Sequence, residues 1–167
     1  MSATNEGDML MKSEAILNHM SKGGTLKTLV DMGEKEMEAI YAVAYNHLSA
    51  NKYDQAIDLF KFLCLYDHTE ARWFYGLGVA QQRKGAHESA VNSYGMATIL
   101  DVDNPRPQAQ AGYCLLALGR WPEAASALEG AIMVCGDTPE HAAIKRQAEA
   151  MLQNAKAKAA GNKGEKA

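Results

Sequence analysis

The apolar, small and turn-forming positions of this chain recur every 34 residues. Alanine marks the interval at Ala56, Ala90 and Ala124. Before each alanine come a small residue, a residue that tolerates a positive φ angle and a ring, and a bulky apolar residue follows it. In repeat order these are Ala44, Gly78 and Gly112; Asn51, Gly85 and Gly119; Tyr53, His87 and Trp121; and Phe60, Tyr94 and Leu128. The pattern predicts one pair of antiparallel helices per repeat, with the small residues where the paired helices approach.

Helix boundaries follow from the same pattern and from the turn residues between its segments. The three pairs are predicted at 34–49 with 53–65, at 70–83 with 87–100, and at 105–117 with 121–134. Before them we expect a helix over 9–21 and a short helix that Thr25 caps and Gly33 ends. A last helix is predicted to open at the connector 136–139 and to end near Asn154.

The predicted fold is all-α, with three tandem tetratricopeptide repeats in a short right-handed solenoid. The expected units are an N-terminal helical extension (1–33), repeats at 34–68, 69–103 and 104–136, a capping helix (137–155) and a flexible tail (156–167). The curved inner face of such an array is a common site of peptide binding. The repeat therefore indicates a peptide-binding function in preference to a catalytic one.

One stripe of each first helix is left over once the packing positions are assigned. On the helix over 34–49 it holds Tyr41, Tyr45 and Leu48, spaced as one helix face. The matching positions are Tyr75, Val79 and Gln82 in the second repeat and Ala109, Tyr113 and Leu116 in the third. Tyrosine joins an apolar body to a polar tip and loses little entropy on binding. The stripe therefore predicts a tyrosine-lined peptide groove, with ordinary packing between repeats as the alternative.

Composition argues against several functional classes. The chain has 17 basic and 20 acidic residues and four of its lysines fall in the last twelve positions, so its body is too acidic to be typical of a nucleic-acid binder. The N-terminus lacks the basic region of a signal peptide, and no apolar run is long enough to span a membrane. The widely spaced Cys64, Cys114 and Cys135 are typical of reduced cytosolic thiols. A cytoplasmic protein is expected.

Catalytic and cofactor motifs are not evident in the sequence. The five histidines lack metal-ligand spacing, and no Cys-x-x-Cys motif occurs. The pair Asp67-His68 would suit acid–base chemistry, but its expected place in a turn between repeats favours a structural or groove-edge role. The segment 76–78 lacks the third glycine of a nucleotide loop and follows no predicted strand. We expect no enzymatic activity, no cofactor and no metal.

Several segments together resemble a known family. The longest comprises LCLYDH at 63–68 and ARWFYGLG at 71–78, and the others are GGTL at 23–26, IYAVAYN at 40–46, PRP at 105–107 and AGYCLL at 111–116. These segments resemble the class II chaperones of type III secretion, which contain tetratricopeptide repeats and bind translocator proteins. The resemblance spans residues 20–152 or thereabouts, in order and without large gaps.

The resemblance implies a bacterial cytoplasmic chaperone. Such proteins bind two hydrophobic translocators, which later form a pore in a host membrane, and keep them soluble and unassembled until export. An extended client segment would lie in the groove. With the stripe, the resemblance assigns to this groove Tyr41, Tyr45, Leu48, Tyr53, Tyr66, His68, Tyr75, Val79, Tyr113 and Leu116. It also implies homodimers through N-terminal helices or the first repeat and, in some members, a transcription activator as partner. From the composition we expect no nucleic acid as partner and no membrane insertion.

A generic tetratricopeptide adaptor or co-chaperone is the alternative. Such a protein clamps an acidic C-terminus and needs Lys, Asn and Arg side chains facing inward across the first helices. Here the inner stripe is tyrosine and aliphatic, and Arg72 and Arg106 at one rim make a poor clamp by themselves.

Overall fold

The computed structural model describes residues 13–164, and every regular element in that range is helical. Residues 13–21 form a helix at the start of this range. The later elements are α2 (Leu26–Leu29), α3 (Glu34–Ser49), α4 (Tyr53–Tyr66), α5 (Ala71–Arg83), α6 (His87–Leu100), α7 (Pro105–Ala117), α8 (Trp121–Cys135), a 3₁₀ helix (Pro139–His141) and α9 (Ala142–Gly164). The all-α fold with three helix pairs is confirmed, and the six repeat helices begin and end within a residue or so of the prediction.

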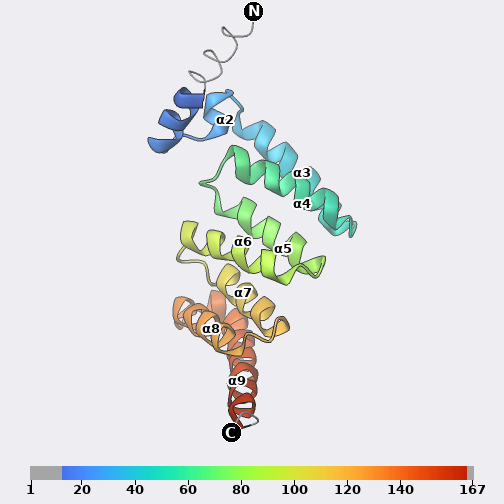
Figure 1. Ribbon diagram of the computed structural model, residues 1–167, viewed down its shortest axis with the longest axis vertical. Coiled ribbons are helices and arrows are strands. Elements are labelled where there is room, and N and C mark those ends of the chain that lie inside the picture. Colours follow the sequence, from blue (N-terminus) through green and yellow to red (C-terminus); the bar gives the residue numbers. More distant parts are fainter. Residues whose placement is uncertain (1–12, 165–167) are drawn as a thin grey trace, which may run out of the picture.

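Each helix from α3 to α9 packs against the next one along the chain. Figure 1 shows the pairs as successive layers along the long axis, with α2 near one end and α9 at the other. Helix α9 contacts both α7 and α8. Its Ala148 and Leu152 form a buried cluster with Leu128 of α8, so α9 covers the apolar face of the last repeat. No helix within residues 13–164 combines the length and apolarity needed to cross a bilayer.

Small residues set the distance between paired helices. A Cβ atom on Gly78 of α5 would lie 2.7 Å from the ring of Tyr94 in α6. In the next pair, a Cβ atom on Gly112 of α7 would lie 2.7 Å from Leu128 in α8. Tyr94 and Leu128 are both fully buried. The close approach of paired helices at small residues is therefore confirmed in these two pairs, and there each glycine meets the bulky residue of its own pair.

The turns inside the repeats share one geometry. Asn51, Gly85 and Gly119 have φ angles of 59°, 84° and 71°, so the three predicted turn positions are confirmed. In each turn the next residue donates a backbone hydrogen bond to the carbonyl five positions earlier: Lys52 to His47, Ala86 to Gln81 and Arg120 to Leu115, at 2.8–2.9 Å. This is the Schellman motif, in which backbone hydrogen bonds pair carbonyl groups at the end of the first helix.

The N-terminal segment differs from the prediction at one residue. Thr25 caps α2 as predicted, because its hydroxyl accepts a hydrogen bond from the backbone of Thr28. Gly33 does not end α2: its φ is −75° and it is the N-cap of α3. The left-handed residue between the helices is Asp31, with a φ of 54°. Aspartate tolerates this conformation better than most residues, so glycine was not required there. Of the helix predicted at 9–21, residues 9–12 lie outside the described range.

The C-terminal helix is longer than predicted. The expected end near Asn154 is wrong, since α9 continues to Gly164. Ala155 is fully buried beside Leu115 and Ala124, so the helix still packs on the last repeat beyond Asn154. Lys156 then pairs with Glu129 of α8 at 2.9 Å. Alanine and lysine are also strong helix formers, so their abundance after Asn154 favours continuation of the helix.

Candidate functional site

The first helices of the repeats, α3, α5 and α7, carry three adjoining pockets. The α3 pocket, of 330 Å³, is lined by Tyr45, Leu48, Ser49, Asn51, Val79 and Arg83. The glutamine pocket, of 570 Å³, is lined by Tyr75, Val79, Gln82, Arg83, His87, Tyr94, Gln110, Tyr113 and Gln147. The arginine pocket, of 270 Å³, is lined by Tyr41, Glu70, Ala71, Arg72, Tyr75, Ala97, Asp101, Asn104, Arg106 and Pro107. Shared residues make the three continuous, and we call them together the groove.

Six of the ten residues assigned from the sequence line the groove. They are Tyr41, Tyr45, Leu48, Tyr75, Val79 and Tyr113. All six lie on α3, α5 or α7, at stripe positions related by the 34-residue offset. The repeat brings them together because each first helix occupies the same place in its layer.

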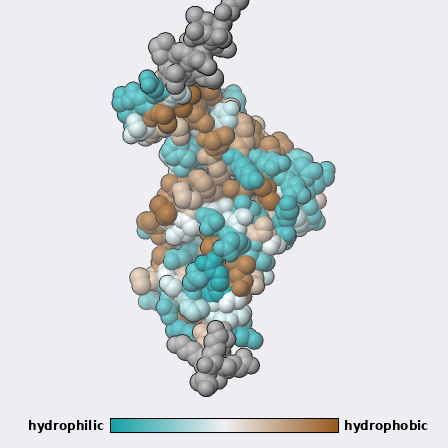
Figure 2. Space-filling model, viewed as in Figure 1, coloured by the Kyte–Doolittle hydropathy of each residue, from teal (hydrophilic) through white to brown (hydrophobic). Residues whose placement is uncertain are grey.

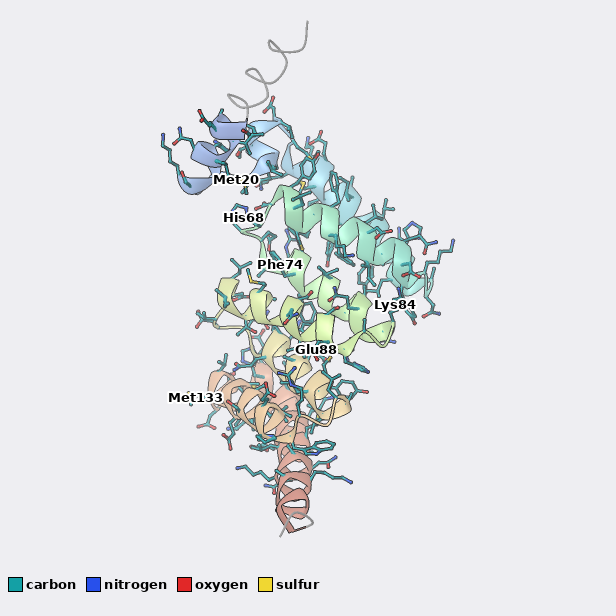
Figure 3. The ribbon with its side chains drawn as sticks, viewed as in Figure 1. Met20, His68, Phe74, Lys84, Glu88 and Met133 are labelled. Atoms are coloured by element: carbon teal, nitrogen blue, oxygen red, sulfur yellow. The ribbon has the colours of Figure 1, made fainter. Side chains whose placement is uncertain are left out.

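The other four lie outside these three pockets. The Tyr53 hydroxyl donates to Oδ1 of Asn51 at 2.7 Å, and the Tyr66 ring stacks on Phe62 with centroids 4.1 Å apart. Leu116 packs against the apolar core that α8 and α9 form with α7. Figure 3 shows His68 in the loop between α4 and α5, at the opposite edge from Lys84 in the α5–α6 turn. For these four residues, as for the six that line the groove, a role in peptide binding stays a prediction.

The tyrosines of the groove differ in how far they are buried. Tyr41 and Tyr75 are partly buried: the ring centroid of Tyr41 lies 5.2 Å from that of Trp73, and that of Tyr75 lies 5.7 Å from that of Tyr94. Tyr45 and Tyr113 are 55% and 45% exposed. The first two therefore form walls that also belong to the core, whereas Tyr45 and Tyr113 offer free ring surface.

The inner tyrosine hydroxyls are protonated at neutral pH, and burial moves their pKa values further above neutrality. It raises the pKa of Tyr41, against an opposing effect of the Arg72 charge, and it raises the pKa of Tyr75 against Arg106. Burial also raises the pKa of Tyr94 strongly. At neutral pH these side chains are hydrogen-bond donors, which fixes the polarity of the groove around them.

The arginines of the groove differ in their partners. Arg72 pairs with Glu38 at 2.6 Å and with Glu70 at 3.3 Å, and these hydrogen bonds raise the pKa of its guanidinium. The guanidinium carbon of Arg72 also lies 4.8 Å from the ring centroid of Trp73. Arg83 and Arg106 form no ion pair with any residue of 13–164. Among these three arginines, Arg72 alone is therefore neutralised by a residue of 13–164.

Sequence reasoning missed part of the lining. It placed His87 among packing residues, although this ring faces Tyr113 in the glutamine pocket with centroids 6.5 Å apart. Arg83 follows the stripe position Gln82 directly, so a wider stripe would have included it. Gln147 comes from α9, which lies outside the repeat, and no offset of 34 could have placed it. Groups of three or more metal-ligating side chains do not occur in the described part of the chain.

Comparisons with known proteins agree with this architecture. A tetratricopeptide repeat family model matches residues 37–69. The Low calcium response locus protein H of Yersinia pseudotuberculosis is 33% identical over 144 residues, which make up 86% of this chain and 86% of that protein.

Solved structures are similar as well. A type III secretion system complex from Aeromonas hydrophila matches with a TM-score of 0.83 and 36% identity, covering 87% of this chain and 97% of that one. The Yersinia enterocolitica type III secretion chaperone SycD, in complex with a peptide of the translocator YopD, matches with a TM-score of 0.72 and 32% identity, covering 76% and 97%. PcrH of Pseudomonas aeruginosa, in complex with the chaperone-binding region of PopD, has a TM-score of 0.72 and 36% identity, covering 75% and 95%. SycD also occurs in an alternative dimer.

Proposed function

Since this chain belongs to the class II, tetratricopeptide-repeat chaperones of type III secretion translocators, we propose that it binds the hydrophobic translocators of its own secretion system. It keeps them soluble and unassembled in the bacterial cytoplasm before export. The observation that carries this proposal is the continuous groove, in which exposed tyrosines and aliphatic side chains follow one another among polar groups along α3, α5 and α7. The function is binding, and no catalytic step is part of it.

The chemistry of the groove suits an extended apolar segment. Leu48 and Val79 offer aliphatic surface, while Tyr45 and Tyr113 offer ring faces beside polar hydroxyls. A client that later enters a membrane carries apolar segments that aggregate when they are exposed to water. A single segment in a few pockets is expected to bind on the order of micromolar, and several segments on one client tighten the complex roughly a hundredfold through effective concentration.

Clamping of an acidic C-terminus is less well supported as a function. Such a clamp needs free cations across the first helices, and Arg72, one of the two rim arginines, is already paired with Glu38 and Glu70. Of the two groove arginines without an ion pair in residues 13–164, Arg83 lines the α3 and glutamine pockets and Arg106 lines the arginine pocket, so none of these three pockets brings two free cations together.

Self-association is a further part of the proposal. Exposed apolar side chains gather at the N-terminal end of the described chain: Leu17, Met20, Leu29 and Val30. Figure 2 shows a hydrophobic area at this end of the described chain, with hydrophilic surface beside it. An apolar surface of this kind suits a second copy of the chain.

Co-expression tests the proposed function. The full chain is produced with each hydrophobic translocator of the same bacterium, and the translocator is measured in the soluble and pelleted fractions. We expect the chaperone to shift the client into the soluble fraction and to co-purify with it. Lys61→Gln on the exposed surface of α4 serves as the control, and the double variant Tyr45→Ala with Tyr113→Ala is expected to lose the effect. No shift for any translocator would contradict the proposal.

A further inference from the structure

Arg83 lies where two pockets of the groove meet. It is the last residue of α5, and it lines both the α3 pocket and the glutamine pocket. The only other residue that the two pockets share is Val79, one helix turn earlier. A chain that runs from one pocket into the other must therefore pass between an aliphatic contact and a guanidinium group.

The charge of Arg83 is not neutralised within residues 13–164. The neighbouring Lys84 pairs with Asp54, and Arg72 pairs with Glu38, but Arg83 has no such partner there. The α3 pocket and the glutamine pocket contain no aspartate or glutamate among the residues that line them. A free cation at this point is notable in a chain whose net charge is −3, and it is available to a ligand.

A hydrogen-bond chain makes the glutamine pocket a donor site. The buried Tyr94 hydroxyl donates to Oε1 of Gln82 at 2.5 Å, and Nε2 of Gln82 donates to Oε1 of Gln110 at 3.1 Å. The Tyr94 hydroxyl is protonated at neutral pH and donates to Oε1 of Gln82, which fixes the orientation of the Gln82 amide. Both amide oxygens are then occupied, and Nε2 of Gln110 is left as a donor without a partner in the described chain.

A donor-rich pocket beside an unpaired guanidinium calls for an anionic acceptor. We propose that Arg83 binds the side-chain carboxylate of an aspartate or glutamate in the client segment, with the Gln110 amide as a second donor. The apolar side chains on either side of this acidic residue enter the α3 pocket and the glutamine pocket. Arg83 thus selects clients in which an acidic residue interrupts an apolar segment. This inference rests on the proposed function and specifies which segments the groove prefers.

The test compares peptides of the same sequence that carry either an acidic or a neutral residue at one position. Fluorescent peptides of the chaperone-binding region of PopD and of the YopD peptide are synthesised with blocked ends, and each position in turn carries Glu, Gln or Lys. Their affinities for the full chain are measured by fluorescence anisotropy. At one position or two adjacent ones, the peptide with Glu is expected to bind about fivefold to tenfold more tightly than the peptide with Gln. A charge-assisted hydrogen bond at a partly exposed site has an effect of this size. Higher salt should narrow this preference.

Variants assign the effect to Arg83. Arg83→Gln should remove the preference for Glu while Gln peptides bind as before, Arg83→Lys should retain part of it, and Arg83→Glu should favour Lys at the same position. The control Lys61→Gln makes the same change in net charge outside the groove and should leave the preference intact. Circular dichroism checks that the variants remain folded.

The outcomes separate this inference from the proposed function. If Glu and Gln peptides bind wild type equally, the role of Arg83 is overturned while peptide binding in the groove stands. The same peptides are also made with a free C-terminus. If only these show an effect of Arg83→Gln, the site takes a chain terminus and the side-chain assignment is wrong. If no peptide of either parent binds, the groove assignment fails together with this inference, whereas solubilisation of translocators remains a separate result.

Discussion

The ammonium group of Lys27 lies 2.5 Å from Oδ2 of Asp67, and this ion pair joins α2 to the loop between α4 and α5. Asp67 is only 3% exposed, and its Oδ1 accepts hydrogen bonds from the hydroxyl and the backbone N–H of Thr69 at 2.6 and 3.2 Å. Burial opposes ionisation of Asp67, but the hydrogen bonds from Lys27 and Thr69 outweigh it and hold the pKa below the ordinary value of 3.8. The N-terminal segment is therefore attached to the first repeat by a buried carboxylate.

Asp67→Asn should destabilise the fold in a pH-dependent way. At neutral pH we expect a loss of about 2 kcal/mol in the free energy of unfolding, because Lys27 loses its partner. The folded pKa lies below the unfolded one, so the contribution is complete above about pH 4 and disappears as the pH falls through the folded pKa. Urea unfolding at about pH 6 and about pH 3 measures the difference between the two proteins. A difference that stays constant with pH would show that charge is not its cause.

Gly78→Ala tests the close approach of α5 and α6. The added methyl would meet the ring of Tyr94, so we expect a loss of about 2 kcal/mol from overpacking, although alanine favours helices. The matched control is Gly95→Ala, in the middle of α6, where a Cβ atom meets nothing within 4 Å. That change should stabilise the protein by up to about 1 kcal/mol. Thermal unfolding distinguishes them, and equal effects would contradict the packing argument.

Tyr45→Ala and Tyr113→Ala should weaken peptide binding without unfolding the protein. Both rings are about half exposed, so each change is expected to reduce affinity for a translocator peptide about tenfold while the melting temperature stays near that of wild type. Tyr75→Ala is the contrasting variant, because its ring packs on Tyr94 and its loss should also lower stability. Anisotropy titrations and circular dichroism check these results. Collapse of the fold in either of the first two variants would place that tyrosine in the core.

The thiols should react slowly in the folded protein. Burial raises the pKa of Cys64 to about 12 and that of Cys114 to about 11, and it also raises the pKa of Cys135. Since the thiolate is the reactive form, a thiol-specific disulfide reagent at about pH 8 should modify native protein far more slowly than protein in urea. The release of the reagent's chromophore gives the rates. A thiol that reacts at once in the native protein would contradict this prediction.

Truncation of α9 tests how far the capping helix stabilises the last repeat. Removal of residues 155–167 deletes the buried Ala155 and the Lys156–Glu129 ion pair, so we expect a loss of about 1–2 kcal/mol. A protein that ends at Ala160 keeps both contacts and is the control. Urea unfolding of the two truncated chains gives the difference. If both are as stable as the full chain, the part of α9 beyond Asn154 does not contribute.

The helix pairs could be predicted closely because each depends on residues close together in the chain and the same residue pattern occurs in three repeats. Gly78 allows a close approach of two helices because it is small, and Asn51 allows a turn because it tolerates a positive φ angle. Residues of the same kind recur at intervals of 34. The N-terminal segment and α9 lack that repetition. There the residue at the left-handed position was taken to be Gly33 when it is Asp31, and the helix end was placed too early.

The groove was predicted only in part for a related reason. The offset of 34 places stripe residues such as Tyr45 and Tyr113 on equivalent faces, but it cannot say which rings the core covers. Burial separates Tyr41 from Tyr45, although the two lie on one stripe and their ring centroids are 6.4 Å apart. The period also could not bring Gln147 from α9 into the glutamine pocket.

The sequence by itself determined the helix pairs, their turns and the family, since each depends on residues close together in the chain or on a pattern that recurs. The tertiary structure alone decided what depends on contacts between distant positions. It joins Lys27 to Asp67 and orients the Gln82 amide between Tyr94 and Gln110. It also leaves the guanidinium of Arg83, where two pockets meet, without an ion-pair partner among residues 13–164. Hydrogen bonds and burial of this kind arise only when the layers stack, because each requires atoms that different helices supply.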